Sequence, residues 1–140
     1  VEIVSAIVVP KTATHGVSTF LKLGARKYLV ISIAMVSARL VIESRMVADA
    51  AIAVGACSPV ARRLVALESR LKGRPADASL ASLATDPLVA EALSPIDDVR
   101  ADAAYRCGLA AELVRRAIAS IATPETEIAA GPGGPPPTSA

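Results

Sequence analysis

Two long alternations of apolar and polar residues in the first half of the chain most constrain its fold. In residues 31–42 the even-numbered positions from Ala34 onward are apolar, whereas Ser37 and Arg39 occupy odd-numbered positions. A side-chain period of two is typical of a strand in a sheet that is covered mainly on one face. Residues 43–45 predict a hairpin turn. The next run places its apolar residues on one face, at Met46, Ala48, Ala50, Ile52, Val54 and Ala56.

Two further strands are predicted nearer the start of the chain. Residues 2–9 are rich in β-branched side chains and stop at Pro10, which is typical of a strand ended by proline. Residues 19–25 predict a short strand that is broken at Gly24. The first half therefore predicts an antiparallel sheet of three to four strands.

The second half of the chain changes to a helical period. Ser58 and Pro59 are a good N-cap and first helical residue, and Gly73 is a good terminator. The apolar stripe of this helix comprises Val60, Leu64, Leu67 and Leu71.

Three later aspartates predict helix starts. Asp77 precedes a short helix that carries Leu80 and Leu83, Asp86 precedes Pro87, and Asp102 precedes the last helix. The predicted core stripe of the last helix is Tyr105, Leu109, Leu113, Ala117 and Ile121, and its predicted far side carries Arg106, Glu112, Arg115 and Arg116.

Strands followed by helices predict an α+β fold, in which about three helices pack on one face of an antiparallel sheet. We expect one domain over residues 1–122. Residues 123–140 are rich in glycine and proline and predict a disordered tail. The first residue is Val rather than Met and a predicted strand follows almost at once, so we expect a fragment or a C-terminal module of something longer.

Composition excludes several classes of function. The 15 basic and 13 acidic residues leave a net charge of +2, which does not favour nucleic-acid binding. No uncharged run reaches the ~20 residues that a membrane-spanning helix needs, and no signal peptide is apparent. We therefore expect a cytoplasmic protein.

The residues that usually carry catalysis are sparse. Cys57 and Cys107 form no metal-binding spacing, and His15 is the only histidine. No arrangement of serine, cysteine and histidine supports nucleophilic catalysis. The chain by itself does not look like an enzyme, and we predict no catalytic and no metal-binding residue.

A basic cluster is the feature of the sequence that suggests a binding site. Lys22, Arg26 and Lys27 precede an uncharged run, residues 28–38. A solvated turn explains such a cluster, and so does a site for an anionic ligand at the edge of a sheet. The residues alone leave both open.

Four segments resemble a known family in the correct order: EIVSAIVVP, FLKLGARKYLVISIAMVSARL, ADAAIAVGACSPVARR and SPIDDVRADAAYRCGLAAELVRRAI. They resemble the C-terminal domain of the FAD-binding (medium) subunit of molybdenum hydroxylases, the xanthine dehydrogenase and carbon monoxide dehydrogenase flavoprotein family. The resemblance covers roughly residues 1–122 and implies a four-stranded sheet with three helices.

The resemblance also implies a function. In this family the flavin subunit takes electrons from iron–sulfur clusters on a small subunit, which receives them from a molybdopterin-containing large subunit. FAD then passes the electrons to NAD or another acceptor. The domains that bind most of the FAD precede this one, and this chain has no Gly-rich phosphate loop before a helix.

Three residues match flavin-facing positions of the family: Val4 for a backbone contact, Lys22 for the lysine beside the flavin, and Arg26 for the arginine of the bordering loop. Many relatives carry an acidic residue near Val30, where this chain has none, so the resemblance implies a different charge balance around the flavin and fixes no acceptor. The alternative is a fragment or a stand-alone interaction or dimerisation domain without flavin binding.

Overall fold

The computed structural model describes residues 3–26 and 30–123. Lys27 of the basic cluster and the predicted tail beyond Thr123 lie outside the described residues. The elements, in chain order, are the 3₁₀ turn η1 (Lys11–Thr14), the strands β1 (Val17–Leu23), β2 (Ala34–Glu43), β3 (Met46–Gly55) and β4 (Arg62–Arg63), the helix α1 (Val65–Leu71), the 3₁₀ turn η2 (Leu80–Leu83), and the helices α2 (Asp86–Ala90) and α3 (Ala103–Ala122).

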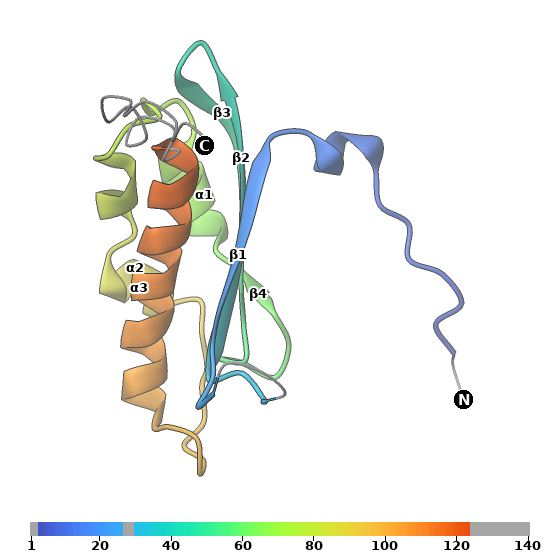
Figure 1. The fold of residues 1–140 in the computed structure, drawn as a ribbon, viewed down its shortest axis with the longest axis vertical. Coiled ribbons are helices and arrows are strands. Elements are labelled where there is room, and N and C mark those ends of the chain that lie inside the picture. The colour runs from blue at the N-terminus through green and yellow to red at the C-terminus, as the bar shows by residue number, and fades with distance from the viewer. Residues whose placement is uncertain (1–2, 27–29, 124–140) are drawn as a thin grey trace, which may run out of the picture.

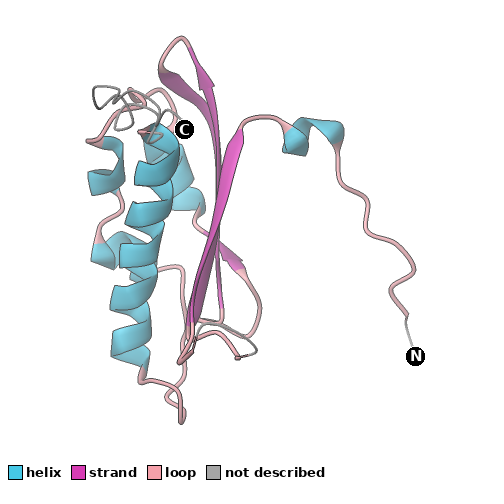
Figure 2. Ribbon diagram, in the orientation of Figure 1, coloured by secondary structure: helices cyan, strands magenta, loops and turns pink. Residues whose placement is uncertain are grey.

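The described strands form one antiparallel sheet in the order β1-β2-β3-β4. All three α-helices lie on the same side of this sheet, and the segment before β1 leaves on the opposite side (Figure 1 and Figure 2). The predicted α+β arrangement is therefore confirmed.

The core lies between the sheet and the helices. Its members come from alternate positions of the long strands and from one stripe of each helix: Ala34, Val36, Ala38 and Leu40 from β2, Ala50, Ile52 and Val54 from β3, Leu67 and Leu71 from α1, and Ala110, Val114, Ala117, Ile118 and Ile121 from α3. The alternation predicted for β2 and for the second half of β3 is thus confirmed.

A β-bulge corrects the predicted register at the start of β3. Val41 pairs with Asp49 and Ile42 pairs with Val47, so Ala48 is the extra residue. The bulge reverses which face is buried, so Val47 enters the core while Met46 and Ala48 are exposed.

Two other predictions were wrong. Residues 3–9 form no strand, and the fourth strand is instead Arg62–Arg63. Ser58 and Pro59 do not start a helix, because the chain first pairs with β3 and the Leu64 N–H donates to the Ile52 carbonyl at 2.9 Å. Helix α1 begins only after this pairing, and Val60 is exposed rather than part of its stripe.

The later helix signals are largely confirmed. Gly73 follows α1 with φ +73°, a conformation that favours glycine. Asp86 and Pro87 open α2, and Asp102 caps α3 by accepting the Tyr105 N–H at 2.7 Å. Asp77 instead closes a turn by accepting from Ser79.

The predicted phase of α3 was wrong at its start. Tyr105 is 54% exposed, whereas Arg106 is 1% exposed and lies with Ala110 and Leu113 on the buried face. Arg106 forms a salt bridge with Asp98 and so ties this helix to the preceding loop.

Candidate functional site

The site begins with Lys22, which lies near the end of β1. Its neighbours Leu21 and Leu23 pack against the core, so the alternation of the strand places Lys22 on the face away from the helices. Lys22 Nζ donates a hydrogen bond to the Val30 carbonyl at 2.9 Å. The side chain also lines an open cleft of about 380 Å³ that Arg26 shares.

Arg26 joins this cleft to a larger one of about 520 Å³. The walls of the larger cleft are mostly aliphatic, and its charged members are Arg26, Asp98 and Arg100. The structure therefore brings Lys22 and Arg26 together around adjoining clefts. Val4 lines neither cleft and lies in the extended segment before η1, where it is 82% exposed.

Arg100 is a further basic residue of this site that the sequence pattern did not single out. It reaches the cleft from the loop before α3, and Nη1 donates to the Ser32 carbonyl at 3.3 Å. Arg100 also forms an ion pair with Asp98. Its guanidinium and its backbone N–H, together with the Arg106 guanidinium, hold the pKa of Asp98 well below its usual range. Asp98 therefore stays ionised and cannot serve as a proton donor near neutral pH.

Arg106 fixes this loop to the sheet from the inside. Nη1 donates to the carbonyls of Ile33 at 3.3 Å and Ala56 at 3.0 Å, Nε donates to that of Ala101 at 3.3 Å, and Nη2 pairs with Asp98. The helical spacing could have indicated this buried position, because Arg106 falls on the same face of the helix as the core residues Ala110 and Leu113.

Cys57 lies beside the hydrogen bonds that Arg106 makes to the sheet. Its Sγ is 3.9 Å from the carbonyl oxygens of Ile33 and Arg106, and burial raises the pKa of the thiol. A buried thiol with a raised pKa is a poor nucleophile, which agrees with a packing role for this cysteine.

The arrangement suits binding rather than catalysis. The guanidinium groups of Arg26 and of Arg100, the latter paired with Asp98, border the aliphatic cleft, and the Lys22 ammonium borders the adjoining one. This arrangement fits a flat group that carries negative charge. Among residues 3–26 and 30–123, no group of three or more His, Cys, Asp and Glu side chains could hold a metal ion.

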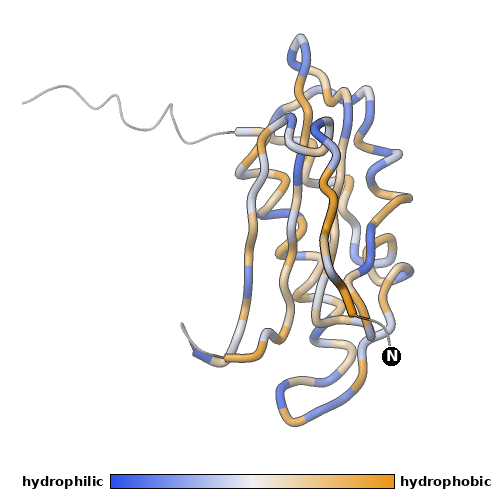
Figure 3. Tube along the Cα trace, turned by 90° about the vertical axis from the view of Figure 1, so that its right-hand side faces the viewer, coloured by the Kyte–Doolittle hydropathy of each residue, from blue (hydrophilic) through white to orange (hydrophobic). Residues whose placement is uncertain are grey.

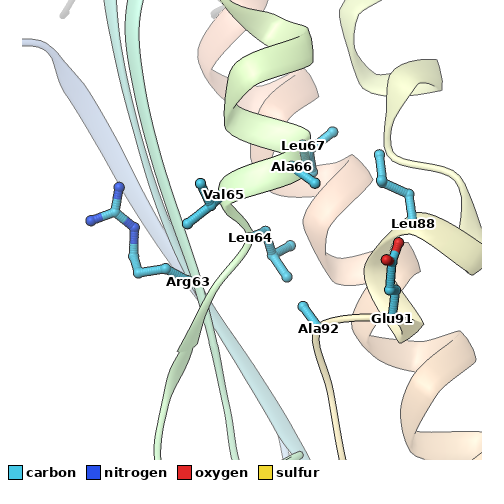
Figure 4. Close-up of a pocket in the computed structure, with 8 residues that line it drawn as sticks. All are labelled: Arg63, Leu64, Val65, Ala66, Leu67, Leu88, Glu91 and Ala92. Atoms are coloured by element: carbon cyan, nitrogen blue, oxygen red, sulfur yellow. The ribbon is translucent and has the colours of Figure 1, made fainter.

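A separate small cleft of about 220 Å³ lies on the helical side, between α1 and α2 (Figure 4). Its lining is aliphatic apart from Arg63 and Glu91. Arg63 is engaged by Glu68, with Nε 2.7 Å from Oε1. This cleft therefore lacks the convergent cations of the site beside Lys22.

Comparison with known proteins yielded one family and several similar structures. The sequence model of one protein family, the CO dehydrogenase flavoprotein C-terminal domain, matches residues 19–121. Quinoline 2-oxidoreductase from Pseudomonas putida 86 is 27% identical with a TM-score of 0.67, over 75% of this chain and 36% of that chain. Carbon monoxide dehydrogenase from Hydrogenophaga pseudoflava, in a form that lacks the Mo-pyranopterin moiety, is 26% identical with a TM-score of 0.65, over 72% and 34%.

The reconstituted CO dehydrogenase from Oligotropha carboxidovorans is 23% identical with a TM-score of 0.65, over 72% of this chain and 35% of that chain, and shows the fold alone. The chain thus spans about a third of the length of the structures it matches. Curated protein sequences gave no match. Within the described part of the chain, no helix is long and apolar enough to cross a membrane.

Proposed function

Because the chain belongs to the family of the CO dehydrogenase flavoprotein C-terminal domain, we propose that it is the module of a molybdenum-hydroxylase flavoprotein subunit that borders FAD. The observation that carries this proposal is the convergence of Lys22 and Arg26 on adjoining clefts with an aliphatic wall. Arg100, which is ion-paired with Asp98, borders the larger of these two clefts.

These residues fit one side of FAD rather than the whole cofactor. The aliphatic wall of the larger cleft suits a ring system, and the cations of its rim suit a negative charge on that ring or on a phosphate. The chain offers no Gly-rich loop that opens a helix, which is the usual cradle of a pyrophosphate. Most of the binding energy therefore belongs to other parts of the subunit.

FAD, when bound in the complete subunit, supplies the transfer of electrons to the final acceptor. The role of this chain is electrostatic: the Lys22 ammonium stabilises negative charge that develops beside it during reduction. Arg26 borders the acceptor side, and Val4 contributes a backbone contact in the complete subunit. The partners that complete the relay are the FAD-binding domains, an iron–sulfur subunit and a molybdopterin subunit, with NAD or another molecule as acceptor, in the cytoplasm.

The flavin potential of the complete subunit tests this proposal. Lys22→Met keeps the length of the side chain and removes its charge, so the fold should survive. Loss of one partly screened cation should destabilise the reduced anion by ~1–3 kcal/mol. For a two-electron couple ~1.4 kcal/mol corresponds to ~30 mV, so the potential should fall by tens of millivolts.

The matched control is Lys11→Met, because Lys11 is exposed on η1 and lines neither cleft. Reduction of the molybdenum centre, assayed with an artificial acceptor that bypasses the flavin, should be unchanged in both variants. Equal potentials in the wild type and the Lys22 variant at full flavin loading would assign Lys22 to solvent.

A further inference from the structure

A further cleft of about 350 Å³ lies between the end of β3 and the loop that precedes α3. We call it the Arg106 cleft, and its polar lining is Ser58, Ser94, Arg100 and Arg106. Hydrophilic and hydrophobic residues alternate along the loop before α3, which lies at the bottom of Figure 1 and of Figure 3. Neither Lys22 nor Arg26 lines this cleft.

Hydrogen bonds join the two segments that form the Arg106 cleft. The Ser94 N–H donates to the Cys57 carbonyl at 3.2 Å and to Ser58 Oγ at 3.0 Å. Arg106 Nη1 donates to the Ala56 carbonyl at 3.0 Å, just after the end of β3. The walls of the cleft are therefore held in place without a ligand, as is usual for small-molecule sites.

Arg106 brings an unused donor to this cleft. A guanidinium carries one N–H on Nε and a pair on each Nη. Nε, both N–H groups of Nη1 and one N–H group of Nη2 are used, by the carbonyls of Ala101, Ile33 and Ala56 and by Asp98. The second N–H of Nη2 has no acceptor among residues 3–26 and 30–123. Arg106 is 1% exposed, and a buried donor of this kind favours a ligand that supplies an acceptor.

Arg100 and Ser94 add further donors to the same lining. Arg100 donates from Nε and Nη2 to Asp98 and from Nη1 to the Ser32 carbonyl, which leaves one N–H on each Nη without an acceptor in the described part of the chain. The Ser94 hydroxyl makes no hydrogen bond to any described residue. Asp98 pairs with both arginines but does not line the cleft, so both charged side chains of the lining are cations.

The rest of the lining is apolar and comprises Ala56, Pro59 and Ile96. Ile96 is 68% exposed, so a bound aliphatic chain would remove apolar surface from water. Two guanidinium groups paired with one carboxylate leave a single positive charge to balance. A monoanion matches that charge, whereas a phosphate monoester carries about −1.5 to −2 at neutral pH.

We propose that the Arg106 cleft binds a small monocarboxylic acid, whose carboxylate accepts hydrogen bonds from Arg106 and Arg100 and whose aliphatic chain lies against Ile96. Hydrogen bonds between a guanidinium and a carboxylate are among the strong ones in proteins, because both partners are charged. The acid does not compete with FAD for Lys22 or Arg26, since neither residue lines this cleft.

The experiment is an NMR titration of the full 140-residue chain with butyrate at pH 7 and constant ionic strength. The amide signals of Ser58, Ser94 and Ile96 should shift and saturate, with a dissociation constant on the order of 1 mM for a ligand of so few atoms. Butylamine has the same chain and the opposite charge, and it should leave these signals unchanged.

Two variants separate charge from shape. Arg100→Met removes one cation of the lining and should raise the dissociation constant by at least about tenfold. Ser94→Leu narrows the cleft without changing its charge and should also weaken binding. Ser94 is exposed and its backbone N–H is retained, so this variant should fold. Arg116→Met is the matched control, because Arg116 is exposed on α3 and lines no part of this cleft. It should bind butyrate like the wild type.

The complete flavoprotein subunit should bind butyrate with the same affinity, measured by calorimetry. The proposal is overturned if the signals of Ser58, Ser94 and Ile96 do not saturate, if butylamine binds as well, or if Arg100→Met binds like the wild type. Binding by the 140-residue chain but not by the complete subunit would also overturn it, because another part of the subunit would then fill the cleft.

Discussion

Arg106 of α3 donates a hydrogen bond from Nη1 to the carbonyl oxygen of Ala56, 3.0 Å away, at the end of β3. Ala56 has φ +64°, a conformation that non-glycine residues rarely adopt. The same guanidinium binds the Ile33 carbonyl at the entry to β2 and pairs with Asp98. One buried cation thus joins the last helix, two strands and the loop that carries Arg100.

Replacement of Arg106 should therefore destabilise the fold strongly. Arg106→Met keeps the aliphatic volume but removes the guanidinium donor to the Ile33 and Ala56 carbonyls and one cationic partner of Asp98. Breaking such a buried, paired cation costs ~3–5 kcal/mol, measured as the loss in free energy of unfolding by urea denaturation. Arg106→Lys should recover part of this loss.

Arg116→Met is the control for Arg106, because Arg116 is exposed and pairs with Glu112 on the helix surface. Its cost should stay below ~1 kcal/mol. Equal losses for the two arginines would refute the role assigned to Arg106.

Glu68 should matter for a different reason. Its carboxylate caps the Ile52 N–H at the edge of β3 and accepts from Arg63 Nε at 2.7 Å. Glu68→Ala leaves that N–H without a partner and should cost ~1–3 kcal/mol of unfolding free energy. Glu68→Gln retains an oxygen acceptor and should cost less, and Glu112→Ala on the surface of α3 serves as the comparison. If Gln and Ala at position 68 are equally harmful, the charge rather than the cap is what matters.

The lowered pKa of Asp98 predicts how the stability of the fold depends on pH. Arg100 first, and Arg106 with it, holds the pKa of this carboxyl below its value of about 3.9 in an unfolded chain. A lowered pKa in the folded state contributes stability that is present above pH ~4 and is lost as the pH falls toward the folded pKa.

Urea denaturation at pH 7 and near pH 3 measures this effect. Asp98→Asn should lower stability at pH 7 and reduce the loss between the two pH values, because the variant has no such proton to bind. Glu91→Gln, which removes an exposed carboxylate, is the control. An Asp98→Asn protein with the same loss of stability on acidification as the wild type would contradict this linkage.

The sequence predicted those parts of the fold that follow from local periodicity. Ala34, Val36, Ala38 and Leu40 alternate into the core as expected, because a sheet covered on one face imposes a period of two. The bulge at Ala48 could not be read from the alternation, since apolar residues at Met46 and Ala48 fit the uninterrupted pattern equally well. Only the pairing of Val41 with Asp49 and of Ile42 with Val47 reveals it.

Long-range contacts explain the other differences. Ser58 and Pro59 satisfy every local rule for a helix start, yet the pairing of the following residues with β3 outweighs that preference. Within the site, Lys22 and Arg26 stand out as a cluster in the sequence. Arg100 and Asp98 join them through long-range hydrogen bonds. Arg100 binds the Ser32 carbonyl and Arg106 binds the Ile33 carbonyl, each more than sixty residues earlier in the chain.

The last prediction concerns the chain on its own. Purified from an FAD-containing medium, the 140-residue protein should carry far less than one FAD per chain. Lys22, Arg26 and Arg100 border open clefts, and three cations on one side of a ligand leave most of its surface in water. The lost translational and rotational freedom of a bound dinucleotide costs at least ~4 kcal/mol, which contacts to one side of the ring offset only weakly.

Flavin absorbance after gel filtration measures the number of FAD molecules per chain, and the complete subunit, with its FAD-binding domains, is the positive control. A yellow protein with about one FAD per chain would mean that residues 1–140 contain a pyrophosphate site of their own.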